Sequence, residues 1–199
     1  MHSMFSFLKI SDPVVSSLAL AVTLGCFFAP ADAQAFPVSD RGDGTFSNPV
    51  IYADVPDLCV TRAGDTYYMV STTMHMSPGI PVMKSKDLVN WELASYCYAE
   101  IDRGDAFSLK NGKNDYASGS WASNIRYDEK LKRFFVINAC NTTNKSYIFS
   151  TDNIEKGQWR CDVVEKCYDP GLILDGENRY VFYGQDGHHY RQMFVEPKT

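Results

Sequence analysis

The sequence has little of several features that point to particular classes of protein. After its N-terminal stretch it has no long hydrophobic run, so nothing later in the chain is expected to cross a membrane. It has no run of basic residues and a net charge of −5, which argues against nucleic acid as a partner. No amphipathic helical pattern of useful length occurs, which disfavours α/β folds.

Cysteine and histidine show no metal-site pattern. The five cysteines that follow Cys26 lack the spacing of a zinc site, and His188 and His189 are interpreted as tail residues rather than ligands. We therefore expect no cofactor. Cys59 and Cys140 lie in apolar, strand-like segments, which favours buried thiols, and one disulfide in an oxidising compartment is the alternative.

The first 33 residues have the layout of a secretory signal peptide. Lys9 lies in a weakly basic start, residues 14–28 are almost continuously apolar, and residues 31–33 form a small-residue cleavage pattern. This predicts a secreted or periplasmic protein. The alternative is a lipoprotein signal that anchors the protein to a membrane through acylated Cys26. More apolar residues follow Cys26, which favours cleavage without lipidation.

The rest of the chain, about 165 residues, repeats one unit of strands and turns. Polar turns lead into aromatic strands, which is typical of β-hairpins. A Ser-x-Asp turn and a later tryptophan then recur about 65 residues apart. Four strands per unit, repeated in tandem, predict an all-β fold of the β-propeller type, and an unrelated all-β sandwich is the alternative. The aromatic strands are expected at 67–72, 134–137 and 179–183, each preceded by a short strand at 58–62, 121–127 and 170–174.

This pattern also predicts the organisation of the chain. It holds two complete units and the first half of a third, about two and a half blades. Because known propellers have at least four blades, we expect the chain to be an N-terminal fragment. The predicted parts are a signal peptide (1–33), an N-terminal linker (34–47), a partial β-propeller domain (48–184) and an atypical tail (185–199).

Two aspartates stand at the mouths of corresponding strands. Asp57 closes NPVIYADVPD and precedes a short apolar run, and Asp169 lies in CYDPGLIL. Carboxylates presented alike by copies of one unit suggest a carboxylate-lined pocket, which sugar hydrolysis often needs. The alternative is that each aspartate caps a turn.

Several motifs, in order along the chain, resemble glycoside hydrolase family 43. NPVIYADVPDLCVTRAGDTYYMVSTT and SPGIPVMKSKDLVNWEL resemble its opening blade, and GSWASNIRY and YDPGLIL resemble its second- and third-blade openings. The match covers roughly Asn48 to Gly184. The resemblance implies a five-bladed β-propeller of inverting β-xylosidases, α-L-arabinofuranosidases and arabinanases, with the active site on the axis. It implies xylose- or arabinose-containing oligosaccharides or polysaccharides as substrates.

The resemblance also implies roles for particular residues. Asp57 matches the general base, and Asp169 matches the aspartate that orients the general acid and adjusts its pKa. In an inverting glycosidase the acid and base carboxyls stand about 6.5–9.5 Å apart, leaving room for water. The family's general acid is a glutamate that opens the fourth blade. Glu196 lacks that context, so the acid is expected to be missing from this chain. An axial cation is possible in the intact family fold.

Two further residues are candidates for substrate binding. Trp121 resembles the tryptophan of the family's Trp-Ala-Pro segment, with Ser123 in place of proline, and could stack against a pentose; a core position is the alternative. Met74 stands where many xylosidase-like members have an aromatic residue, which leaves the choice between xylose and arabinose open. The expected function is hydrolysis of O-glycosidic bonds in pentose polysaccharides. The alternatives are a non-catalytic carbohydrate-binding propeller and an inactive remnant of a truncated gene.

Overall fold

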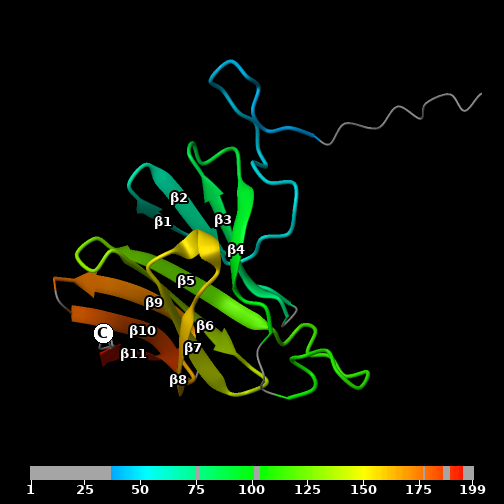
Figure 1. The fold of residues 1–199 in the computed structure, drawn as a ribbon, viewed down its shortest axis with the longest axis vertical. Coiled ribbons are helices and arrows are strands. Elements are labelled where there is room, and N and C mark those ends of the chain that lie inside the picture. The colour runs from blue at the N-terminus through cyan, green and yellow to red at the C-terminus, as the bar shows by residue number, and fades with distance from the viewer. Residues whose placement is uncertain (1–36, 75–76, 101–103, 177, 186–188, 195–199) are drawn as a thin grey trace, which may run out of the picture. The chain divides into compact units, whose positions relative to one another are not determined.

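A computed structural model describes residues 37–74, 77–100, 104–176, 178–185 and 189–194 (Figure 1). The predicted signal peptide with Cys26, His188 and Glu196 lie outside these residues. Strands and turns account for nearly all of the described chain, as predicted for an all-β fold. Its helices include none with the length and apolar character needed to span a membrane.

Three antiparallel sheets follow one another along the chain, each built from consecutive strands (Figure 1). A single turn of 3-10 helix, η1 (Ile154–Lys156), connects the last two strands of the second sheet. The first sheet contains β1 (Cys59–Ala63), β2 (Thr66–Val70), β3 (Gly79–Ser85) and β4 (Glu92–Tyr98). The second contains β5 (Ser120–Asp128), β6 (Arg133–Cys140), β7 (Lys145–Thr151) and β8 (Arg160–Glu165). The third contains β9 (Tyr168–Asp175), β10 (Asn178–Gln185) and β11 (His189–Phe194).

The third sheet has one strand more than the sequence predicts. Residues 185–199 are predicted as a tail outside the strand pattern, but β10 extends to Gln185, and residues 189–194 form β11, which pairs with β10. The segment HYRQMF lacks the apolar alternation on which the prediction relied, and antiparallel backbone pairing does not require it. At the other end, the predicted linker carries an isolated bridge between Asp40 and Phe46.

Strand β6, in the interior of the second sheet, is buried on both faces. Phe134 and Val136 pack with residues of the first sheet in one core. Phe135 and Ile137 point to the opposite face and pack with residues of the third sheet in another core. Because successive side chains of a strand alternate between faces, a strand between two cores is apolar along its length. The run FFVI reflects this position.

The first strands of the three sheets lie side by side, with β5 between β1 and β9 (Figure 1). The backbone N–H of Tyr127 in β5 donates to the hydroxyl of Thr61 in β1 at 3.1 Å. On the other side, the backbone N–H of Leu172 in β9 donates to Oδ1 of Asn124 in β5 at 3.0 Å. We call these first strands, β1, β5 and β9, the inner strands. Their adjacency brings the strand openings at Asp57 and Asp169 toward one place.

Candidate active site

The openings of the three inner strands share an unusual backbone conformation. Asp57 precedes β1, Ala122 lies near the start of β5, and Asp169 lies near the start of β9. Their φ angles are +52°, +47° and +45°. A left-handed backbone costs a non-glycine residue roughly 1–2 kcal/mol, and aspartate and asparagine tolerate it best. The repeated unit therefore presents one residue per sheet in the same strained conformation, and two of the three are aspartates.

Irregular pairing accompanies this conformation in the second and third sheets. The register between β5 and β6 shifts between Trp121 and Asn124, the segment that contains Ala122. The register between β9 and β10 shifts between Phe182 and Gly184, opposite the start of β9. Bulges bend a strand and redirect its side chains, and they are frequent next to active sites.

A pocket of about 320 Å³ lies where these strands begin, and both predicted catalytic aspartates line it. Asp57 and Asp169 are both exposed, so each carboxylate is accessible to a ligand. Three residues of β5 lie between them on the pocket wall. The complete described lining is Asp57, Leu58, Cys59, Ala122, Ser123, Asn124, Asp169 and Pro170.

Thr72 connects the opening of β1 to the opening of β5. Its hydroxyl donates a hydrogen bond to Oδ2 of Asp57 at 2.7 Å. The hydroxyl oxygen of Thr72 accepts the backbone N–H of Ala122 at 2.9 Å. Through the Thr72 hydroxyl, the carboxylate of Asp57 is therefore linked to the backbone of β5.

The two predicted substrate-binding residues are not among the described lining residues of the pocket. Trp121 is half-buried directly before Ala122, and its indole N–H is buried without a hydrogen-bond partner among the described residues. The backbone carbonyl of Met74 accepts the N–H of Ala117 at 3.1 Å, in the loop that leads into β5. The hydroxyl of Ser123, which replaces the expected proline, is buried and also has no partner among the described residues.

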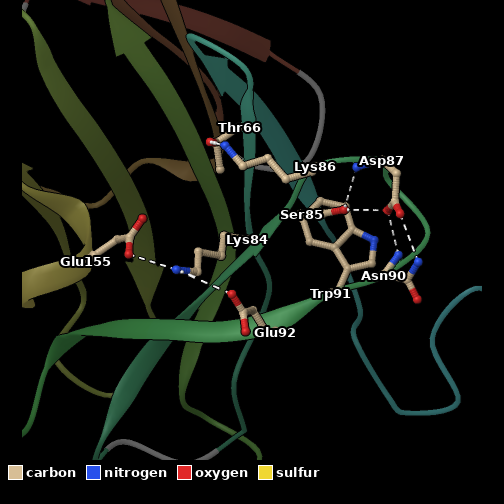
Figure 2. Close-up of a pocket in the computed structure, with 9 residues that line it drawn as sticks. All are labelled: Thr66, Lys84, Ser85, Lys86, Asp87, Asn90, Trp91, Glu92 and Glu155. Carbon is tan, nitrogen blue, oxygen red and sulfur yellow. Dashed lines mark hydrogen bonds and ion pairs between the residues drawn. The ribbon is translucent and has the colours of Figure 1, made fainter.

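A second pocket, of about 390 Å³, lies at the far end of the first sheet (Figure 2). Three of its charged groups are paired with one another: Lys84 lies 2.8 Å from a carboxylate oxygen of Glu155 and 3.4 Å from one of Glu92. The hydrogen bond from Lys84 lowers the pKa of Glu155 despite its partial burial. Charges already satisfied within the wall are poorly placed to bind a polar ligand.

The Ser-x-Asp turn forms part of that second pocket and explains its polar residues. The hydroxyl of Ser85 accepts the N–H groups of Asp87 and Leu88, at 3.1 and 2.8 Å. Hydrogen bonds from the side chain and backbone of Asn90 hold the pKa of Asp87 well below its usual value. The corresponding turn of the second sheet uses Thr151 and Asn153. The hydroxyl of Thr151 accepts the N–H of Asn153, and the side-chain oxygen of Asn153 accepts the N–H of Lys156. At both places, side-chain oxygens that accept backbone N–H groups stabilise a turn.

Neither metal nor disulfide chemistry is indicated in the described part of the chain. It contains no group of three or more histidine, cysteine, aspartate or glutamate side chains able to hold a metal ion. All of its cysteines are free thiols: Cys59, Cys97, Cys140, Cys161 and Cys167. Burial raises the pKa of the Cys167 thiol to about 11, so this sulfur stays protonated at neutral pH.

Sequence reasoning missed Thr72 and Asn124. Each forms its decisive hydrogen bond with a residue about fifty positions later in the chain. Thr72 sits in a Ser-Thr-Thr run after an aromatic strand, which carries no local signal of such a contact.

Comparisons with known proteins identify the family of the chain. The family model described as glycosyl hydrolases family 43 matches residues 46–196. The chain is 39% identical over 157 residues to a β-xylosidase of Formosa agariphila, covering 76% of this chain and 26% of that protein. It is 32% identical to a non-reducing end α-L-arabinofuranosidase of Bacteroides ovatus, covering 67% of this chain and 25% of that protein.

Solved structures show the same relationship. A bifunctional GH43-CE protein of Bacteroides eggerthii is 44% identical and superimposes with a TM-score of 0.68, covering 76% of this chain and 19% of that one. The chain thus spans about a quarter of the length of the curated relatives it matches. On the family match over most of its described residues, the chain belongs to glycosyl hydrolase family 43.

Proposed function

We propose that this chain carries the general base of an inverting glycoside hydrolase that releases xylose or arabinose from plant-derived pentose polysaccharides or oligosaccharides. The observation that carries the proposal is that Asp57 and Asp169, which have the same left-handed backbone at the openings of β1 and β9 on either side of β5, line one pocket. Family membership and the β-xylosidase and arabinofuranosidase relatives support the substrate class.

In the proposed reaction, the carboxylate of Asp57 accepts a proton from a water molecule. The oxygen of that water attacks the anomeric carbon from one face while the glycosidic C–O bond breaks on the other. The leaving oxygen takes its proton from a general acid, and the anomeric configuration inverts. Asp169 orients that acid and, as a nearby negative charge, favours its protonated form.

We further propose that the general acid is a glutamate that this chain does not contain. The described lining of the pocket includes two carboxylates and no glutamate. In this account the three sheets are the first part of a five-bladed propeller, with the pocket on its axis. Export by residues 1–33 would place the enzyme outside the cytoplasm, where its polysaccharide substrates occur.

An experiment with leaving groups of different basicity tests this proposal. Loss of general acid assistance costs about 10²–10⁴-fold in rate. A 2,4-dinitrophenolate leaves without protonation, so the chain should hydrolyse 2,4-dinitrophenyl β-D-xyloside or α-L-arabinofuranoside much faster than the methyl glycosides. Asp57→Asn should abolish this turnover. Saturable sugar binding without turnover would favour a binding protein. The absence of both turnover and sugar binding would overturn both functions.

A further inference from the structure

The hydroxyl of Thr72 is placed to hold one oxygen of Asp57 and leave the other open. Thr72 is buried, at 6% exposed, while Asp57 is exposed to the pocket. The hydroxyl proton goes to Oδ2 of Asp57, and no described residue donates to Oδ1. A carboxylate bound in this way has one oxygen fixed and the other available to a water molecule.

The orientation of the Thr72 hydroxyl is itself determined by its second hydrogen bond. A threonine hydroxyl has one proton to donate and can accept two hydrogen bonds. Because the oxygen accepts the backbone N–H of Ala122, its proton must point elsewhere, and Asp57 lies 2.7 Å away. Ala122 has the left-handed φ of +47°, so the strained backbone of β5 aims the N–H that orients this hydroxyl.

Thr72 is also fixed along the backbone. Its own N–H donates to the carbonyl of Pro56, adjacent to Asp57, at 3.0 Å. The next residue, Thr73, exchanges two backbone hydrogen bonds of 3.0 Å with Ser120 at the start of β5. These three backbone hydrogen bonds, made by Thr72 and by the residue that follows it, restrict the position of the Thr72 hydroxyl.

We propose that Thr72 is a positioning residue for Asp57: its hydroxyl, oriented by the N–H of Ala122, fixes the carboxylate in the rotamer that activates water in the pocket. The inference deepens the proposed function and rests on it, because it concerns how the same base works. The ligand class is a pentoside together with the water molecule that attacks it.

The chain offers a matched control for this proposal. The hydroxyl of Thr61 likewise accepts a backbone N–H across the β1–β5 boundary, from Tyr127 at 3.1 Å, but within the described part of the chain no hydrogen bond joins it to a carboxylate. Thr61→Val and Thr72→Val each remove one hydroxyl that accepts an inter-strand N–H and nearly preserve side-chain shape. Only Thr72→Val also removes a donor to Asp57.

The test compares the unaltered 199-residue chain with Thr72→Val, Thr72→Ser and Thr61→Val. With a 2,4-dinitrophenyl pentoside as substrate, Thr72→Val should lower kcat about 10- to 100-fold with little change in KM, because a misplaced base impairs attack more than binding. Thr72→Ser should restore most of kcat, and Thr61→Val should leave it within about 2-fold. A loss that is equal in Thr61→Val, or that appears in KM alone, would overturn the positioning role.

A second readout separates this inference from the function on which it rests. With ¹³C-labelled aspartate, the ¹³Cγ resonance of Asp57, assigned by its loss in Asp57→Asn, should shift in Thr72→Val. It should stay unchanged in Thr61→Val and Thr72→Ser. If the unaltered chain shows no Asp57-dependent turnover, the proposed function fails, while an unmoved resonance in Thr72→Val would by itself exclude the hydrogen bond to Asp57.

Discussion

Asp57 and Asp169 open two inner strands with the same left-handed backbone, at φ of +52° and +45°, and both line one pocket. Strained backbone conformations persist where the surrounding structure requires them, and they cluster at functional sites. Here the conformation recurs at corresponding places in repeated sheets, with Ala122 at the third place. The fold thus presents both carboxylates through the same left-handed backbone conformation.

The backbone of Asp57 makes a prediction about stability. Asparagine tolerates a left-handed backbone nearly as well as aspartate, whereas alanine does not. Asp57→Asn should therefore keep the free energy of unfolding of the unaltered chain, and Asp57→Ala should lower it by about 1–2 kcal/mol. Urea denaturation followed by circular dichroism measures both. Equal stability of the two variants would show that the left-handed conformation imposes no such cost.

The buried ion pair between Asp128 in β5 and Arg179 in β10 should be costly to break from one side. The two side chains are 6% and 5% exposed. Arg179→Met leaves the carboxylate buried without its counter-charge and should lower the free energy of unfolding by about 3–5 kcal/mol. Lys113→Met, which breaks the exposed pair with Asp105, should cost under about 1 kcal/mol. Similar losses in the two variants, measured by urea denaturation, would contradict this account.

The carboxyl group of Asp128 also predicts how the free energy of unfolding depends on pH. Burial acts to raise the pKa of Asp128, but the backbone N–H of Leu131 and the Arg179 guanidinium outweigh it and hold the pKa below the usual 3.8. A group whose pKa is lower in the folded state stabilises the fold fully above its unfolded-state pKa. That contribution is lost as pH falls below 3.8 and through the folded-state pKa. Asp128→Asn should therefore flatten the acid limb of the stability curve, and an unchanged limb would exclude this role.

Gly119, directly before β5, should not tolerate a side chain because the backbone of Thr73, which follows β2, lies too close to it. A Cβ at this position would lie 2.1 Å from the backbone carbonyl oxygen of Thr73. Gly119→Ala should therefore disturb the Thr73–Ser120 bridge and lower the free energy of unfolding by about 1–3 kcal/mol. At Gly171 the nearest atom to such a Cβ is 3.9 Å away, so Gly171→Ala serves as the control. Thermal denaturation compares them, and equal melting temperatures would contradict the expected clash.

The all-β fold could be predicted because most strands are short aromatic segments between polar turns. The predicted strand at 67–72 is β2 at Thr66–Val70, and that at 179–183 lies within β10. β11 escaped prediction because the segment HYRQMF shows no apolar alternation, although its backbone pairs with that of β10. Local pattern identifies strands in which apolar and polar residues alternate or aromatic residues gather, and it misses a strand whose sequence shows neither.

The candidate site was predicted only in part, for a similar reason. Asp57 and Asp169 stand in recognisable strand openings, and the structure brings them to one pocket. Thr72 and Asn124 act through contacts with strands about fifty residues away, and such contacts leave no periodic signal in the sequence. Trp121 and Met74 keep their predicted substrate-binding role as a hypothesis.

The stereochemistry of the first product tests the role of Asp57 most directly. Hydrolysis of 2,4-dinitrophenyl β-D-xyloside or α-L-arabinofuranoside by the chain is followed by proton NMR before the free sugar mutarotates. If Asp57 directs water to the face opposite the leaving group, the first sugar formed has the inverted anomeric configuration, and Asp57→Asn forms none. A first product of retained configuration, or turnover that survives in Asp57→Asn, would contradict the account.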